Sequence, residues 1–161
     1  FAYTPEQNIA HSMTALMAQN KGAGKKNRMQ EGFRCGMVLE SIYGIFIFLV
    51  CFIFAKPLMC LFVQDEEVIM HGVTYLHLIS IMYILPAFTN GIQGFFRGIG
   101  DLKITLISSL VNMTVRVIVA APLVFSLHLG IEALPYSYLA GWIGMLMAEL
   151  PLLIRTYKAY E

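Results

Sequence analysis

The polar residues that interrupt long apolar stretches are the residues of this chain most able to do chemistry. Arg116 is the clearest case, because a cation in the middle of an apolar helix is costly unless protein or water surrounds it. Ser108, Asn112 and Arg116 recur at intervals of four residues, so they share one helix face. We expect this face to point toward protein or water rather than lipid.

Glu6 is a candidate partner for Arg116. It lies in the polar segment 1–20, which also carries His11. Counting back from Asn20 places Glu6 about 21 Å along a helix, and Arg116 lies about 18 Å into its own helix. These similar depths suggest an ion pair. The alternative, that Arg116 extends outward to the interface or only fixes helix packing, stays open at this point.

A proline interrupts the apolar stretch 70–96 and is followed by polar residues. Pro86 is expected to bend this helix and to free a backbone carbonyl. Thr89, Asn90 and Gln93 come soon after it. A bent helix with polar side chains near the break can form the wall of a solute cavity, although packing alone also explains these residues.

Two further acids lie within apolar stretches. Glu40 and Glu149 each stand six residues from an arginine, and we expect both to reach the membrane interface. Gly36, Glu40 and Gly44 share a helix face, which favours close helix packing around this carboxylate. Proton or ion handling by these acids is the alternative interpretation.

Two glycine-containing runs resemble parts of known motifs. Gly22-Ala23-Gly24 and Gly98-Ile99-Gly100 do not complete a phosphate-binding pattern and do not follow strands, so helix termination explains them better. Gly98-Ile99-Gly100-Asp101 also matches the GxGD string of intramembrane aspartyl proteases, which pair two aspartates. The only other aspartate is Asp65, which is expected on the opposite membrane face. We therefore expect no enzyme, no catalytic residue, no metal site and no cofactor.

These residues require membrane-spanning helices to position them. About 20 apolar residues make one bilayer crossing. The composition fits, because 58% of the residues are hydrophobic and only 13% are charged. Four stretches are long enough, and with segment 1–20 they predict an all-α polytopic bundle of about five helices, at approximately 3–20, 35–55, 70–96, 104–125 and 133–154.

The basic residues predict the orientation of the bundle. Lys and Arg cluster in segment 21–34, in the turn at 97–103 and after residue 154, which alternate threading places on one face. The positive-inside rule makes that face, with the C-terminus, cytoplasmic. The opposite face receives Lys56 and the acidic residues Asp65, Glu66, Glu67 and Glu132. We expect a multi-pass protein of the plasma (inner) membrane that binds no nucleic acid.

The order of the motifs resembles the multidrug and toxic compound extrusion (MATE) family. The resemblance rests on the run Met17-Ala18-Gln19-Asn20-Lys21-Gly22-Ala23-Gly24-Lys25-Lys26, then Asp65-Glu66-Glu67-Val68 before Tyr75-Leu76. It continues in Gln93-Gly94-Phe95-Phe96-Arg97-Gly98-Ile99-Gly100-Asp101 and in Asn112 with Arg116. It covers nearly the whole chain.

The resemblance implies a secondary antiporter with two six-helix lobes, of which this chain supplies the last five helices of the second. It implies export of organic cations or other amphiphiles in exchange for Na+ or H+. The pathway candidates are Glu6, His11, Asn90, Gln93, Asn112 and Arg116. The first lobe is then the missing partner, and the chain, which starts abruptly at Phe1, is a fragment. The Met70 to Phe96 helix carries no acid where some members have a coupling acid.

A flippase of lipid-linked precursors is an alternative with the same architecture. It moves a large anionic head group, which calls for a more cationic cavity than one buried arginine provides. Arg116 is the only residue of the sequence that favours it.

Overall fold

The computed structural model describes residues 3–125, 130 and 133–158, and within these residues the secondary structure is helical. The helices are α1 (Tyr3–Gly22), α2 (Lys26–Ile53), α3 (Ala55–Cys60), α4 (Glu66–Met82), α5 (Ile84–Gly98), α6 (Leu102–Phe125) and α7 (Ala133–Lys158). This confirms the all-α bundle expected from the sequence. The expected external link at 126–132 lies outside the described residues, apart from Gly130.

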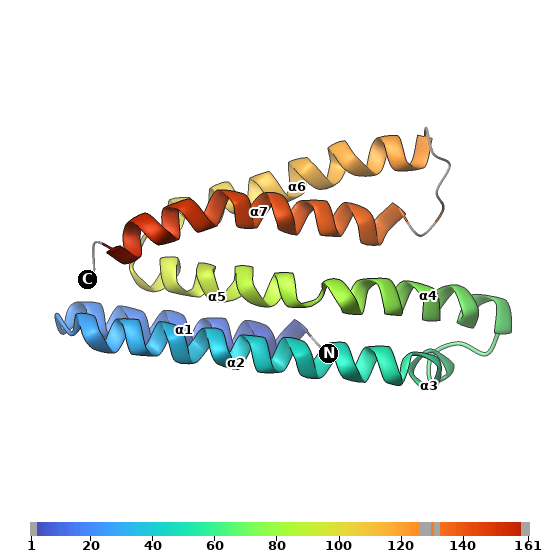
Figure 1. The fold of residues 1–161 in the computed structure, drawn as a ribbon, viewed down its shortest axis with the longest axis horizontal. Coiled ribbons are helices and arrows are strands. Elements are labelled where there is room, and N and C mark those ends of the chain that lie inside the picture. The colour runs from blue at the N-terminus through green and yellow to red at the C-terminus, as the bar shows by residue number, and fades with distance from the viewer. Residues whose placement is uncertain (1–2, 126–129, 131–132, 159–161) are drawn as a thin grey trace.

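The helices run side by side along the long axis of the molecule, and α5 lies at the centre (Figure 1). It contacts α1 and α2 on one side and α6 and α7 on the other, whereas α1 and α6 do not touch. Eleven of the fifteen residues of α5 are buried. Residues of α5 can therefore reach both helix pairs.

The turns at one end of the bundle are made by glycines. Gly24, between α1 and α2, has a φ of 67°, and Gly100, between α5 and α6, has a φ of 83°. Side chains other than glycine rarely adopt this left-handed conformation, so both glycines end their helices. The Lys21 ammonium donates to the Ile99 carbonyl and ties the two turns together.

The second helix begins earlier than the sequence indicated. It starts at Lys26 rather than near Cys35, so the expected polar loop is a short turn followed by helix. The expected start near Cys35 was based only on where the apolar stretch begins. A helix also continues through charged residues such as Arg28 and Glu31 when water solvates their side chains, because its backbone hydrogen bonds are internal.

The expected bend near Pro86 is present. Helices α4 and α5 meet at Tyr83 with a bend of 45°. Pro86 has no N–H to donate to the carbonyl of Met82, and Met82 is the last residue of α4. At the other end of α4, Asp65 accepts hydrogen bonds from Glu67 N (2.9 Å) and Val68 N (3.2 Å), as expected of an N-cap.

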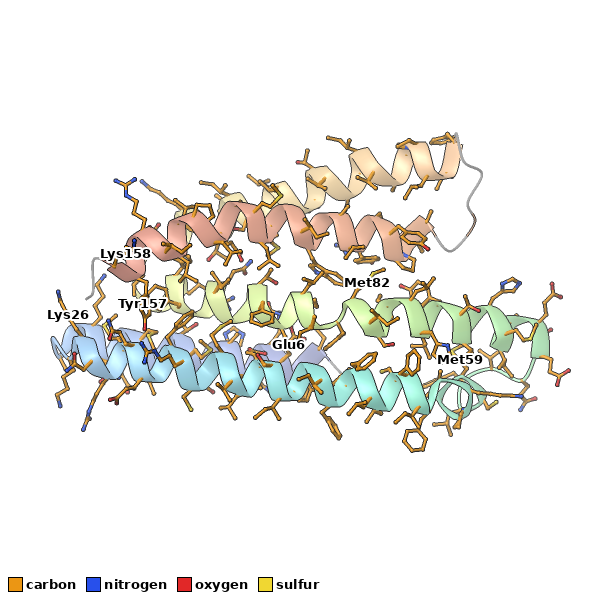
Figure 2. The ribbon with its side chains drawn as sticks, viewed as in Figure 1. Glu6, Lys26, Met59, Met82, Tyr157 and Lys158 are labelled. Carbon is orange, nitrogen blue, oxygen red and sulfur yellow. The ribbon has the colours of Figure 1, made fainter. Side chains whose placement is uncertain are left out.

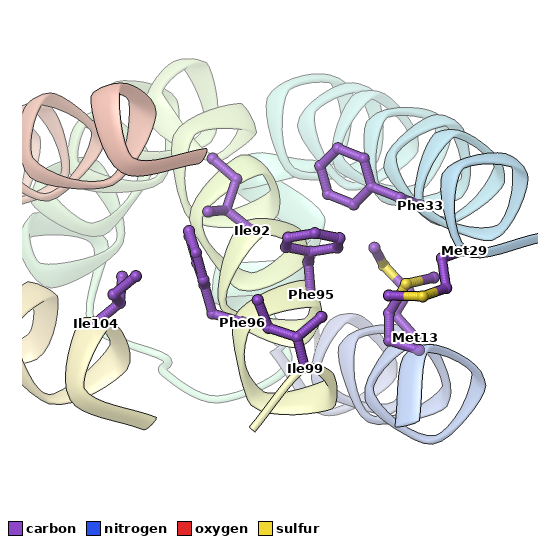
Figure 3. Close-up of a cluster of buried hydrophobic side chains, with 9 residues drawn as sticks. Met13, Met29, Phe33, Ile92, Phe95, Phe96, Ile99 and Ile104 are labelled. Carbon is purple, nitrogen blue, oxygen red and sulfur yellow. The ribbon is translucent and has the colours of Figure 1, made fainter. Parts of the chain in front are cut away.

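A cluster of buried hydrophobic side chains lies between the helices (Figure 3). Phe33 of α2 and Phe95 of α5 pack with ring centroids 5.0 Å apart. The buried cluster consists of Met13, Met17, Met29, Phe33, Ile92, Phe95, Phe96, Ile99 and Ile104. Methionine and phenylalanine side chains of α1, α2 and α5, with Ile104 at the start of α6, thus hold α5 in place.

The outward faces of the helices are apolar. Exposed side chains include Ile53 (63%) of α2 and Val117 (68%) of α6, as expected for surfaces that contact lipid. Among the described residues, three helices are long and apolar enough to cross a membrane, and a fourth crossing results if α4 and α5 form one bent span. Lys26 and Lys158 lie at the same end and Met59 lies at the other (Figure 2), so basic flanking residues gather at one end.

Candidate functional site

A cleft of about 520 Å³ opens between the α4–α5 span and the α6–α7 pair. Aromatic and polar side chains line it together. The aromatic residues are Tyr3, Tyr75, Tyr83, Tyr138 and Trp142, and the polar ones include Thr89, Asn90, Gln93, Ser109, Asn112 and Arg116. Such a lining suits an amphiphilic solute, because the rings offer apolar area and the polar groups fix orientation.

Four of the six pathway residues predicted from the sequence meet in this cleft. Asn90 and Gln93 come from α5, and Asn112 and Arg116 come from α6. Their four-residue and three-residue spacings place each pair on one helix face, which is why the sequence could find them. The aromatic residues of the lining were missed, although Tyr138 and Trp142 are also four residues apart on α7.

Arg116 lies over an aromatic ring. Its guanidinium carbon is 3.5 Å from the centroid of the Tyr138 ring, which is a cation–π contact. Gly141 of α7 makes room for it, because a Cβ there would lie 2.6 Å from Arg116 Cγ and 3.1 Å from Asn112 Oδ1. The Asn112 amide in turn donates to the sulfur of Met145 (3.1 Å). The polar stripe of α6 therefore packs on α7.

The predicted ion pair between Glu6 and Arg116 is wrong. Glu6 Oε1 accepts a hydrogen bond from Asn90 Nδ2 (2.5 Å), while Arg116 stacks on Tyr138. The two residues lie in α1 and α6, and α5 separates these helices (Figure 1). Depth along a helix fixes one coordinate of a residue, and it does not fix the direction in which the side chain points.

Two amides of α5 connect the cleft to buried carboxylates. Asn90 donates to Glu6 of α1, and Gln93 Nε2 donates to Glu149 Oε1 of α7 (3.1 Å). Both glutamates are fully buried, with 0% of their surface exposed. Burial of an acid without a cationic partner is costly, so the two amides are the main polar support that these acids receive.

The expectation that Glu40 and Glu149 reach the membrane interface is wrong. Both are 0% exposed, because α2 and α7 turn these side chains inward against α5. The expected close packing around Glu40 is present. Gly36 packs on Met13 of α1, and Gly44 packs on Ile84 and Ala87 of α5. The distance to the nearest arginine in sequence therefore did not predict where these carboxylates point.

His11, the remaining pathway candidate, is exposed and does not line the cleft. It lies on the face of α1 opposite Ala10 and Met13, which are buried. The structure thus brings five of the six candidates to α5 or to the cleft beside it, with Glu6 behind Asn90. His11 is directed away from them.

The motif residues on which the family resemblance rests lie mostly at helix ends. Gln19 and Gly22 are exposed, and Asn20 donates to the carbonyl of Leu16 (2.8 Å). Gly24 and Gly100 make the turns described above.

Gly98 has a packing role. It is buried against α1, because a Cβ there would lie 2.3 Å from Met17 Cβ and 2.7 Å from Thr14 O. These residues shape the bundle rather than the cleft.

The structure does not form the aspartate pair of a protease. Asp65 caps α4 at one end of the bundle, and Asp101 precedes α6 at the end where the glycine turns lie. They are the only aspartates of the chain. Within the described ranges, no three His, Cys, Asp or Glu side chains gather as metal ligands.

A curated relative was found for most of the chain. The probable multidrug resistance protein NorM of Thermotoga maritima is 25% identical over 146 residues, which is 90% of this chain and 30% of the relative. The chain thus spans about a third of the length of this relative and of the solved structures that it matches.

Solved structures show the same fold. A MATE structure in the bent conformation superimposes with a TM-score of 0.90 at 15% identity over 96% of this chain and 35% of the other. An inward-facing multidrug resistance MATE family transporter of the MOP superfamily gives 0.87 at 16% identity, over 92% and 34%. The MATE transporter ClbM in complex with Rb+ gives 0.78 at 18% identity, over 96% and 37%.

The MatE family model matches residues 1–123, well over half of the 161 residues. The matched segment contains α1 to α5 and most of α6, and so includes the glycine turns and all residues that line the cleft except those of α7. This chain therefore belongs to the MatE family, the multidrug and toxic compound extrusion transporters.

Proposed function

We propose that the full-length protein is a secondary antiporter that exports organic cations or other amphiphilic compounds in exchange for Na+ or H+. In this proposal the described helices form part of one of two lobes, and the missing lobe of the same chain completes the pathway. No cofactor other than the coupling ion is required. The relative named as a probable multidrug resistance protein supports the same assignment.

The cleft is the observation that carries this proposal. It is large enough for a small drug, at about 520 Å³, and tyrosines, a tryptophan and amides line it. Aromatic faces attract organic cations, and amides bind varied polar groups without imposing a charge. The bend at Tyr83 places the polar residues of α5 in its wall.

We place the basic end of the bundle and the C-terminus in the cytoplasm, in a plasma (inner) membrane protein. The gathering of Lys26 and Lys158 at one end supports this orientation (Figure 2). Maleimide labelling of single cysteines introduced at Lys26 and Glu66 in intact cells tests it. Only the cysteine at Glu66 should react with a reagent that does not cross the membrane.

Export is tested with the complete gene in cells that lack their own drug exporters. Cells should extrude ethidium when a Na+ or H+ gradient is imposed, and Tyr138→Ala should slow this export. Tyr136→Ala is the matched control, because Tyr136 lies two residues away on α7 and does not line the cleft. Export that persists after both gradients collapse would reject antiport.

A lipid-linked precursor flippase remains a second candidate, and one observation favours it. Arg116 is the only charged residue that lines the cleft within the described part of the chain. An arginine suits an anionic head group and repels a cationic drug. Arg116→Gln separates the two functions: it should abolish the movement of an anionic substrate, whereas export of ethidium should persist.

A further inference from the structure

A groove of about 410 Å³ lies between α2 and α7 at the basic end of the bundle, away from the cleft. Both helices pack on α5, and the Phe33 ring of α2 meets the Tyr157 ring of α7 with centroids 5.9 Å apart. Figure 2 shows Tyr157 close to Lys158, at the end where Lys26 also lies. The groove is lined by Phe33, Arg34, Leu153, Ile154, Tyr157 and Lys158.

Aromatic rings form the floor of this groove. Phe33 is buried, and its ring packs on the ring of Phe95 in α5 with centroids 5.0 Å apart. Phe95 in turn packs edge-on against Phe96, with centroids 5.6 Å apart. The floor thus continues into the buried cluster of the bundle, and helix packing fixes its shape. A preformed surface of this kind binds a ligand with little loss of protein entropy.

The two ends of the groove differ in polarity. Arg34 and Lys158 are exposed cations. On α7, Leu153 and Ile154 precede Lys158 by about one turn, so they lie about 6 to 8 Å closer to the middle of the bundle. On α2, Val38 follows Arg34 by one turn on the same face, and 56% of its surface is exposed. Cations therefore stand at the end of the groove, and apolar side chains extend from it into the membrane.

The charge around the groove is positive. The described segment 26–34 carries three cations and one acid, Glu31, and the last turn of α7 adds Arg155 and Lys158. This field attracts an anion to the groove. Basic pockets between membrane helices at the level of the head groups are typical sites for anionic lipids.

An anionic phospholipid matches both parts of the groove. Its phosphate accepts hydrogen bonds from a guanidinium and an ammonium group, and its acyl chains cover apolar side chains at membrane depth. We propose that the α2–α7 groove binds one anionic phospholipid, with the phosphate at Arg34 and Lys158 and an acyl chain along Ile154. The bound lipid connects the basic ends of α2 and α7. This inference goes beyond the proposed transport function and does not depend on it.

The charge of the groove selects among lipids. Phosphatidylcholine carries a cationic choline group next to its phosphate, and the surrounding Lys and Arg side chains repel it. The head group of phosphatidylglycerol has no cation. Phosphatidylglycerol should therefore bind more tightly than phosphatidylcholine with the same acyl chains.

The test uses the purified full-length protein in mixed micelles that contain both lipids. Native mass spectrometry measures how much of each lipid stays bound as the lipid concentration falls. The wild type should retain phosphatidylglycerol in preference to phosphatidylcholine. Each cation beside an anionic lipid contributes about fivefold to affinity, so Arg34→Gln/Lys158→Gln should weaken phosphatidylglycerol binding about 25-fold. Its binding of phosphatidylcholine should not fall.

The matched control is Arg28→Gln/Lys103→Gln, which removes the same charge from the same end. Both of these residues are exposed, and neither lines the groove. This variant should keep the wild-type preference for phosphatidylglycerol. Equal losses in the two double variants would show that the net charge of this end attracts the lipid, and would overturn the proposal. An unchanged affinity in Arg34→Gln/Lys158→Gln would also overturn it, because another part of the protein then covers the groove.

A second measurement distinguishes a lipid from a soluble anion. A ligand of the folded state raises Tm, so short-chain phosphatidylglycerol should raise the Tm of the wild type, and inorganic phosphate at the same concentration should not. Ile154→Ser should reduce the rise, whereas Ile107→Ser, at similar depth on α6 and outside the groove, should keep it. An equal rise with inorganic phosphate, or an equal response of the two serine variants, would reject the lipid as the occupant.

Discussion

Substitution of Gly94 by alanine should separate the two helices that hold the Asn90–Glu6 contact. A Cβ on Gly94 of α5 would lie 2.7 Å from the carbonyl oxygen and 3.3 Å from the Cα of Ala10 in α1. Both are backbone atoms, so no side-chain rotation relieves the clash, and one helix must move. Thr14 Oγ1, which donates to the Gly94 carbonyl at 3.1 Å, would move with it.

The net effect can be estimated from three contributions. Overpacking costs about 1–3 kcal/mol, and loss of an interhelical hydrogen bond in a membrane costs about 0.6 kcal/mol. Alanine regains about 1 kcal/mol of helix propensity over glycine. The variant should therefore lose about 0.5–2.5 kcal/mol of unfolding free energy, because the backbone clash exceeds the gain in propensity.

The assay is reversible unfolding of the purified full-length protein in mixed micelles, with increasing SDS. Gly22→Ala is the matched control, because a Cβ at the end of α1 meets nothing within 4 Å. It should unfold at the wild-type SDS fraction or above it. If Gly94→Ala proves as stable as Gly22→Ala, the backbone contact between Gly94 and Ala10 does not determine how closely α1 and α5 pack. That result would refute the predicted clash.

Three further predictions concern the N-terminal cap of α4, the bend between α4 and α5, and the aromatic ring beneath Arg116. Asp65→Ala should cost about 1 kcal/mol and speed amide exchange in the first turn of α4, whereas Asp65→Asn should not, because asparagine caps equally well. Pro86→Ala restores an N–H for the Met82 carbonyl and should straighten the 45° bend, seen as a longer spin-label distance between the two ends of the span. Tyr138→Leu removes the ring beneath Arg116 and should lower stability by about 1 kcal/mol, and Tyr138→Phe should retain most of it; equal losses would reject the cation–π contact.

Local chemistry in the sequence was enough to predict two helix ends and one bend, although it missed the start of α2 at Lys26. Pro86 bends its span, and Gly24 and Gly100 end helices, each for a reason contained within a few residues. The sequence also predicted which residues share one face of a single helix. Asn112 and Arg116 share a stripe, and the structure places both in the cleft.

Contacts between helices could not be predicted in this way. The bond from Asn90 to Glu6 joins residues 84 apart, and helical periodicity says nothing about which helix a face will meet. Glu40 shows the limit most clearly. Its own helix places it one turn from two glycines, but its burial depends on other helices, because Gly44 packs against α5 and Gly36 packs against Met13 of α1.

The break at Tyr83 divides one membrane crossing into halves with different tolerance to sequence change. Only two of the seventeen residues of α4 are buried, against eleven of the fifteen in α5. Random mutagenesis should therefore find many acceptable replacements before residue 83 and few after it. In the first half, sequence change should be restricted chiefly at Tyr75 and Ile79, which line the cleft, whereas most positions of the second half are confined by the helices around them.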